Sequence, residues 1–281
     1  MKIKKYYLYH ATAERALSAI DAGLDEVVIS TDLNQTTGTF QIMDSSVVID
    51  ESNHLSIDDL HMIIKNNNKV YGLCGGNLDV IESREGGYYK LVPTSSAPYL
   101  EISGVKMHIS KGVCPYQNAR ETAVQVVRSG HRVLDTCGGL GYTAIASMEL
   151  GAKTVISVEV NPVVTSIRES NPWSQKISDQ RITMVDEDVA EYIRGVDDNS
   201  FDSIIHDPPR FSLAGELYSE DFYRQMHRVL RKKGGLFHYT GNPGKMTKGK
   251  SFMNKAAERL KFAGFRRVTP NTKLMGLRAI K

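Results

Sequence analysis

The stretch Val133-Leu-Asp-Thr-Cys-Gly-Gly-Leu-Gly-Tyr-Thr-Ala144 decides the fold of this 281-residue chain. A short apolar segment ends in the acid Asp135, and the chain then turns through three glycines into a helical pattern. Glycine adopts backbone dihedrals that other residues resist, and it lets a ligand approach the main chain. The stretch therefore predicts a strand, a tight ligand-binding turn and the start of a helix.

Apolar segments alternate with helical patterns on both sides of this turn. The segments that predict strands are 132–135, 154–159, 182–185, 201–206, 235–239, 266–269 and 273–280. Such alternation is typical of an α/β fold, in which a mostly parallel sheet carries helices on both faces. We therefore expect a doubly wound, mostly parallel seven-stranded sheet, with ligands bound beyond the carboxyl ends of its strands.

The first hundred residues have a different pattern. Short apolar segments separated by polar residues predict strands near 26–31, 39–43, 46–50, 69–73, 77–82 and 88–92. One helix is expected to begin at Ser56, with Asp59 in the capping-box position. We therefore expect a small β-rich N-terminal domain, residues 1–110, that recognises substrate or covers the site. Residues 111–281 would form the second domain.

Three acids follow three successive predicted strands. Asp135 precedes the glycines, Glu159 ends the next strand, and Asp188 follows the third, where Asp186 and Glu187 are rival positions. An acid placed like Glu159 can accept hydrogen bonds from both hydroxyls of a ribose. An acid near Asp188 can accept one from the amino group of adenine. Together these acids predict a nucleoside-binding site.

The charge of the glycine turn distinguishes between two nucleoside cofactors. Residues 139–144 fit the G-x-G-x-x-A pattern of dinucleotide-binding proteins, so an NAD-binding oxidoreductase is one alternative. The Asp135 carboxylate would repel a diphosphate, but it can accept hydrogen bonds from an ammonium group. S-adenosylmethionine carries an ammonium and a sulfonium, so the turn favours this cofactor over NAD.

Residues 115–281 resemble the class I S-adenosylmethionine-dependent methyltransferases. The turn of that family reads Asp-x-Gly-x-Gly-x-Gly, and here Cys137 replaces the first glycine. The chain looks most like predicted archaeal methyltransferases related to the spermidine synthases, and 217–230 resembles a helix of that superfamily. The resemblance implies S-adenosylmethionine as cofactor. The residues expected to bind it are Asp135, Thr136, Gly139, Gly141, Tyr142, Glu159 and Asp188.

A second motif, His206-Asp-Pro-Pro-Arg-Phe211, follows the fourth predicted strand. It resembles the Asn/Asp-Pro-Pro-aromatic motif of amino-group methyltransferases, although Arg210 occupies the aromatic position. Because prolines fix the backbone, the Asp207 side chain and a main-chain carbonyl can hold a planar amino group toward the methyl group. We therefore expect Asp207, Pro208 and Pro209 to form the catalytic loop.

Basic residues are concentrated near the end of the chain. Residues 231–281 contain fourteen Lys and Arg and one acid, Glu258, whereas the whole chain has a net charge of only +3. This segment indicates an anionic partner, with RNA or DNA the first candidate, or else a solvated basic surface. It argues against a polyamine, the cationic substrate of the aminopropyltransferases, which are the main alternative chemistry. A non-enzymatic RNA-binding module is the remaining alternative.

The composition excludes several other classes of protein. No apolar run reaches the length of about 18 residues that a membrane helix needs, and the basic start at Met1 lacks the apolar core of a secretion signal. The three cysteines are too few and too far apart for a disulfide framework or a zinc site. We therefore expect a cytoplasmic protein without a metal. The methyl acceptor and the oligomeric state stay open.

Overall fold

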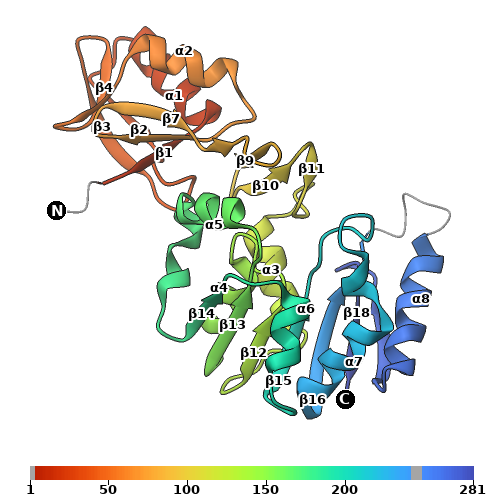
Figure 1. Ribbon diagram of the computed structural model, residues 1–281. Helices are drawn as coiled ribbons and strands as arrows, with labels where there is room; N and C mark the ends of the chain where they lie inside the picture. Colours follow the sequence, from red (N-terminus) through yellow and green to blue (C-terminus); the bar gives the residue numbers. More distant parts are fainter. Residues whose placement is uncertain (1–3, 242–248) are drawn as a thin grey trace. The chain divides into compact units, whose positions relative to one another are not determined.

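The computed structural model describes residues 4–241 and 249–281 of a chain that divides into two compact units (Figure 1). The first unit extends to Pro115 and also includes Ser166–Gln175. The second unit consists of Tyr116–Thr165 and Lys176–Lys281. The expected domain boundary between residues 110 and 111 stays a prediction, and each unit is described by itself below.

The described part of the first unit is built from three small antiparallel sheets and two complete helices. The sheets have the strand orders β1-β6-β7, β2-β3-β4-β5 and β11-β10-β9-β8. The strands are β1 (Tyr6–Leu8), β2 (Glu26–Ile29), β3 (Gly38–Met43), β4 (Ser46–Asp50), β5 (Asn53–Leu55), β6 (Tyr71–Cys74), β7 (Asn77–Val80), β8 (Glu82–Ser83), β9 (Tyr89–Val92), β10 (Tyr99–Ile102) and β11 (Val105–Lys106). The helices are α1 (His10–Asp21) and α2 (Ile57–Lys65).

The two helices differ in how well the sequence predicts them. The Ser56 hydroxyl accepts a hydrogen bond from the Asp59 amide, and the Asp59 carboxylate accepts one from the Ser56 amide, which confirms the capping box of α2. Helix α1 lies where no helix was expected. Its buried residues are Thr12, Ala13, Ala16 and Ala19, and such small side chains give a weak apolar period.

The second unit is organised around a seven-stranded sheet with the order β14-β13-β12-β15-β16-β18-β17. All neighbours from β14 to β16 are parallel, and β18 is antiparallel to both β16 and β17. This confirms the expected α/β class and its mostly parallel sheet. The strands are β12 (Arg132–Asp135), β13 (Thr154–Val158), β14 (Ile182–Val185), β15 (Phe201–His206), β16 (Leu230–Tyr239), β17 (Arg266–Asn271) and β18 (Gly276–Ile280).

The strand order reverses between β12 and β15. The chain runs outward from β12 through β13 to β14, and then returns to add β15 on the other side of β12. In the parallel register Asp135 lies opposite Ile205, so the loops that leave the two strands diverge from one point. Doubly wound sheets bind their ligands in the crevice at such a reversal.

Helices cover both faces of this sheet (Figure 1). Successive strand residues face opposite sides: Leu134 and Ile204 pack toward one layer, whereas Val133 and Ile205 pack toward the other. The first layer contains α6 (Val189–Tyr192), α7 (Glu220–Val229) and α8 (Gly249–Phe262), and the second contains α3 (Pro115–Val124) and α4 (Tyr142–Glu149). The helix α5 (Pro162–Glu169) follows β13. Within the described ranges, no helix is long and apolar enough to cross a membrane.

The packing of α7 generates a stability prediction. Met226 is fully buried in the apolar layer that α7 forms against the sheet. We expect Met226→Ala to lower the free energy of unfolding by about 2–5 kcal/mol, because it removes buried surface and leaves a cavity. The control is Arg224→Ala at an exposed position on the same helix, which should cost about 0.5 kcal/mol or less. Urea unfolding measures both, and equal losses would contradict this packing.

Candidate active site

The glycine turn between β12 and α4 has the backbone shape that the sequence predicts. Gly139 and Gly141 have positive φ angles of 50° and 80°, which side chains other than glycine rarely accept. Gly141 is the N-terminal cap of α4, and its amide donates to the Gly138 carbonyl over 2.7 Å. The space beside Gly139 is open, since a Cβ there would meet no atom within 4 Å.

The structure also requires a glycine at position 138, which the sequence motif alone does not reveal. A Cβ at this position would lie 2.6 Å from the Ser157 hydroxyl oxygen, inside van der Waals contact. Its φ is not positive, so the constraint is space and not dihedral angle. Of the two adjacent glycines, Gly139 is needed for its positive φ, and Gly138 is needed so that β12 and β13 can approach each other.

Asp135 is fully buried at the end of β12. Its Oδ2 atom accepts hydrogen bonds from the hydroxyls of Thr143, over 2.8 Å, and Ser157, over 2.9 Å. These neutral donors hold the carboxylate in place beneath the glycine turn. They do not neutralise its charge, which adds to desolvation in raising the pKa of the nearby Asp207.

Glu159 follows β13 and ties its carboxylate to the glycine turn. The Oε2 atom accepts from the Gly139 amide over 2.9 Å, and the Oε1 atom accepts from the Asn161 amide over 2.9 Å. A main-chain amide of the turn is thus already bound to an anion. The buried Asp135 carboxylate and the Glu159 carboxylate on the Gly139 amide both disfavour a diphosphate at this turn and suit a ligand with positive charge.

The other three expected cofactor ligands also have structural partners. Asp188 is exposed and caps α6, because its Oδ1 atom accepts from the Ala190 amide over 2.7 Å. Tyr142 is buried, and its ring lies edge-on to Tyr116 with centroids 5.7 Å apart. Thr136 is buried, and its hydroxyl lies 2.7 Å from Nδ1 of His206. Their roles in cofactor binding stay predictions.

The Asp207-Pro-Pro loop begins where β15 ends, beside the glycine turn. Desolvation by the surrounding protein, followed by the charge of Asp135, raises the pKa of Asp207 to about 7. Protein atoms surround Asp207 closely enough to desolvate it, but the residue keeps accessible surface, whereas Pro208 is buried. An acceptor can therefore reach Asp207 while the backbone is held. The Tyr218 hydroxyl donates to the Pro209 carbonyl over 2.9 Å and fixes the far side of the loop.

Two buried histidines, His206 at the end of β15 and His238 in β16, lie next to this loop. The Nε2 atom of His206 donates to the Leu217 carbonyl over 2.9 Å, which leaves Nδ1 to accept from the Thr136 hydroxyl. The ring of His238 lies 4.6 Å from that of His206, and its Nε2 atom is 2.8 Å from the Tyr223 hydroxyl. Burial lowers the pKa of His206 well below its usual value and that of His238 to about 4. Both rings are therefore neutral framework groups, and their partners are not visible in the sequence.

A pocket of about 170 Å³ lies between the loop after Asp207 and helices α7 and α8. Aromatic rings and two cationic side chains line it: Phe211, Tyr218, Tyr223, Phe252, Lys255, Ala256 and Arg259. The Arg259 guanidinium donates to the Tyr218 carbonyl over 3.1 Å. Such a lining is compatible with a planar or anionic group and unfavourable for a polycation. Among the described residues, no group of three or more His, Cys, Asp or Glu is arranged to hold a metal ion.

Comparison with known proteins agrees with this geometry. The model of the TRM5/TYW2 methyltransferase domain matches residues 104–268. An uncharacterized protein of Methanocaldococcus jannaschii is 38% identical over 276 residues, which cover 97% of this chain and 95% of that protein. A polyamine aminopropyltransferase of Thermoplasma volcanium is 26% identical over 141 residues, or 49% of this chain and 48% of that enzyme.

The fold is shared with a spermidine synthase solved in complex with the transition-state analogue AdoDATO. The TM-score is 0.57 at 16% sequence identity, and the match covers 100% of this chain and 81% of that chain. The reversed sheet order, the glycine turn and the family match define an S-adenosylmethionine-dependent methyltransferase. The chain belongs to the TRM5/TYW2 methyltransferase domain family, and its similarity to an archaeal protein agrees with the resemblance noted from the sequence.

The tight contact at Gly138 generates a second prediction. We expect Gly138→Ala to lower the free energy of unfolding by about 1–3 kcal/mol, because the new methyl group would overlap the Ser157 hydroxyl. Gly195→Ala is the matched control, since a Cβ at Gly195 meets no atom within 4 Å and its φ is not positive. Thermal unfolding compares the two variants. A Gly138→Ala protein as stable as the control would contradict the close approach of β12 and β13.

Proposed function

We propose that this enzyme transfers the methyl group of S-adenosylmethionine to an amino nitrogen of RNA, with Asp207 orienting the acceptor. The observation that carries the proposal is the meeting of two loops at the strand reversal. The glycine turn leaves β12 at Asp135, and the proline loop leaves β15 only two residues beyond Ile205, the residue opposite Asp135. A cofactor on the first loop and an acceptor on the second would therefore be neighbours.

The residues of the glycine turn fit S-adenosylmethionine. The open side of Gly139 gives room for a ligand against the main chain. The buried Asp135 charge favours the positive groups of this cofactor, and Glu159 keeps oxygen lone pairs for the ribose hydroxyls. Asp188 would reach the adenine through its second oxygen. When bound, S-adenosylmethionine supplies the electrophilic methyl group.

The proline loop fits a planar amino group. In its ionised form, the Asp207 carboxylate accepts a hydrogen bond from one amino hydrogen, and a carbonyl of the loop accepts the other. The nitrogen lone pair is then held out of the plane of these contacts, toward the transferred methyl group. Orientation of this kind supplies several kcal/mol of the barrier. Pro208 and Pro209 would act by holding the loop in this shape.

Two alternative activities are disfavoured by charge. For NAD, the buried Asp135 and the Glu159 carboxylate bound to the Gly139 amide both oppose a diphosphate. For aminopropyl transfer, Lys255 and Arg259 line the pocket behind Asp207 and would repel a polyamine. The likeness to aminopropyltransferases nevertheless makes this reaction the alternative to test. In parallel assays, labelled methyl groups from S-adenosylmethionine should enter RNA, whereas decarboxylated cofactor and putrescine should yield no product.

Cofactor binding is the first test of the proposed site. S-adenosylhomocysteine should bind the wild-type protein with measurable heat in titration calorimetry. Glu159→Gln should weaken binding about tenfold, because a charged acceptor for the ribose hydroxyls is lost. Glu191→Gln, at an exposed position in α6, is the control and should bind like wild type. No heat at high micromolar concentration, or tighter binding of NAD, would contradict the proposal.

The protonation of Asp207 gives the second test. Because its pKa is raised to about 7, the hydrogen-bonding carboxylate is lost as the pH falls below 7. We expect kcat/KM for S-adenosylmethionine, which reports the free enzyme, to rise with pH through about 7. Asp207→Asn should remove this rise, because the amide still accepts a hydrogen bond but does not titrate.

A second variant of Asp207 distinguishes a role in catalysis from a role in cofactor binding. Asp207→Ala should lower kcat about 100-fold through loss of orientation, while S-adenosylhomocysteine affinity stays within about threefold of wild type. The matched control is Asp221→Ala, which removes an exposed acid from the first turn of α7 and should leave kcat unchanged. Wild-type turnover in Asp207→Ala would refute the role of this carboxylate.

A further inference from the structure

Two groups of basic residues stand out among the described residues of 231–281, whereas Lys245 and Lys248 lie outside the described part of the chain. Lys255 and Arg259 line the pocket behind Asp207. Others lie at the opposite end of the strands, where β16 and β17 begin. Strand β18 runs antiparallel to both and ends there, with Ile280 opposite Gly235 and Arg266. The Lys233 amide donates to the Lys281 carbonyl over 3.1 Å there, and Arg266 lies opposite Ile280.

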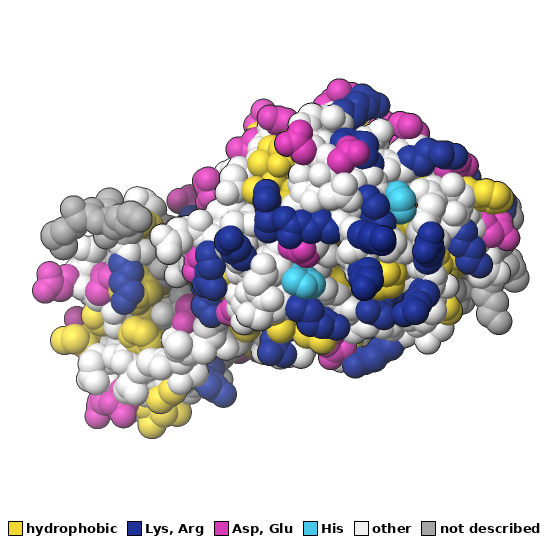
Figure 2. Space-filling model, turned by 90° about the horizontal axis from the view of Figure 1, so that it is seen from below, with side chains coloured by type: hydrophobic (Ala, Val, Ile, Leu, Met, Phe, Trp, Pro, Cys, Tyr) yellow, Lys and Arg dark blue, Asp and Glu magenta, His cyan; other side chains and the backbone are white. Residues whose placement is uncertain are grey.

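Basic residues from other parts of the sequence join them at this edge. Arg132 begins β12 and lies opposite Thr154, the first residue of β13, so Lys153 is its neighbour. Figure 2 shows Lys and Arg side chains gathered over this face, which looks down in Figure 1. We define the cationic edge as the exposed residues Arg132, Lys153, Lys232, Lys233, Arg266 and Arg267.

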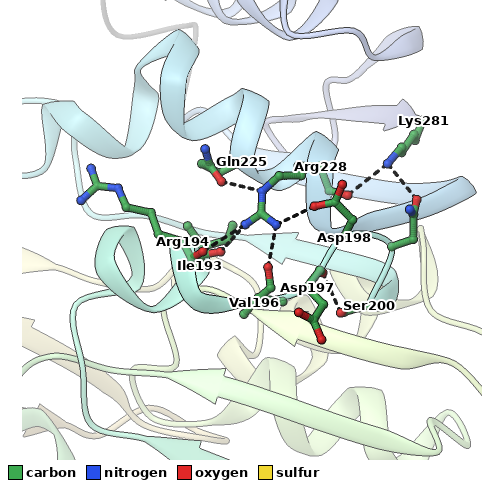
Figure 3. A network of polar contacts seen from close by, with 10 residues as sticks. Ile193, Arg194, Val196, Asp197, Asp198, Ser200, Gln225, Arg228 and Lys281 are labelled. Atoms are coloured by element: carbon green, nitrogen blue, oxygen red, sulfur yellow. Dashed lines mark hydrogen bonds and ion pairs between the residues drawn. The ribbon is translucent and has the colours of Figure 1, made fainter.

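Two other arginines near the cationic edge form ion pairs within the protein. The Arg228 guanidinium donates to the carbonyls of Ile193 and Val196 and pairs with Asp198 over 2.8 Å (Figure 3). Arg231 pairs with Asp202 over 2.8 Å. These contacts occupy two of the acids at this edge and close the turn that precedes β15.

The six members of the cationic edge differ from Arg228 in this respect. Within residues 4–241 and 249–281, none of their side chains forms an ion pair. From β13 to β17 the edge crosses six adjacent strands, a width of about 24 Å at 4.8 Å per strand step. This is an extended row of uncompensated positive charge and not a pocket for one small anion.

We propose that the cationic edge binds the phosphate backbone of the RNA acceptor, at a distance from the methylated nucleotide. This rests on the proposed function. The six residues of β15 separate the edge from Asp207 by about 20 Å at 3.3 Å per residue. A free nucleotide does not span this distance, so the surface fits a folded RNA that contacts both ends of the strands. Phosphate contacts of this kind position the RNA without reading its sequence.

The test compares two charge-reversal variants of the full chain. Lys153→Glu/Lys232→Glu changes the cationic edge, and Arg120→Glu/Arg224→Glu makes the same charge change at exposed positions on α3 and α7. The probe is a fluorescently labelled RNA hairpin, and its affinity is measured by anisotropy at several salt concentrations. The edge variant should bind at least tenfold more weakly, with a salt slope smaller by about 1.5 for two lost phosphate contacts. The control should remain within about twofold of wild type.

S-adenosylhomocysteine calorimetry on the same samples separates this proposal from the proposed function. Unchanged cofactor affinity in the edge variant, together with weaker RNA binding, supports the assignment. Equal RNA affinity in the two variants overturns it, even where the wild-type protein binds the cofactor. Vesicles containing phosphatidylserine test an anionic lipid surface as the alternative partner. An edge variant that loses vesicle binding but keeps its RNA affinity also overturns the assignment of the cationic edge to RNA. A wild-type protein that fails to bind cofactor refutes the proposed function and leaves the RNA comparison readable.

Discussion

The parallel pairing of β12 with β15 is the constraint on which the rest of the structure depends. It brings a buried carboxylate, Asp135, and the proline loop at Asp207 to the same end of the sheet. The 2.7 Å contact between the Thr136 hydroxyl and His206 joins the two strands just below these loops. Desolvation, and after it the charge of Asp135, raises the pKa of Asp207. The proposed roles of Asp135 in cofactor binding and of Asp207 in acceptor orientation therefore both depend on this one strand pair.

Local patterns were enough to predict the sheet and the loops at its carboxyl edge. The glycine turn, the acid before it and the alternation of strands with helices are each readable over a few residues, and the structure confirms the seven-stranded sheet. The alanine-faced helix α1 was missed because its buried side chains are small. The cap that Asp188 gives to α6 is a local contact between residues two positions apart. The partners of His206 depend on tertiary contacts, which a single sequence does not display.

The distribution of charge required the structure for the same reason. In sequence the basic residues form one segment, which suggests one anionic partner near one site. Lys232, Lys233, Arg266 and Arg267 lie at the starts of β16 and β17, at the far end of the strands from the proline loop, whereas α8 brings Lys255 and Arg259 behind that loop. Basic residues that are close in the sequence therefore contribute to two separate surfaces with different surroundings. Only one of them adjoins Asp207.

A crystal structure of the protein with S-adenosylhomocysteine would test the central claim most directly. Our account predicts ligand density along Gly139 and Gly141, with the ribose hydroxyls on Glu159 and the sulfur atom facing the Asp207 loop. It also predicts that Asp135 keeps its bonds to Thr143 and Ser157. Density for the ligand away from the β12–β15 reversal, or a sulfur atom turned away from Asp207, would contradict the account.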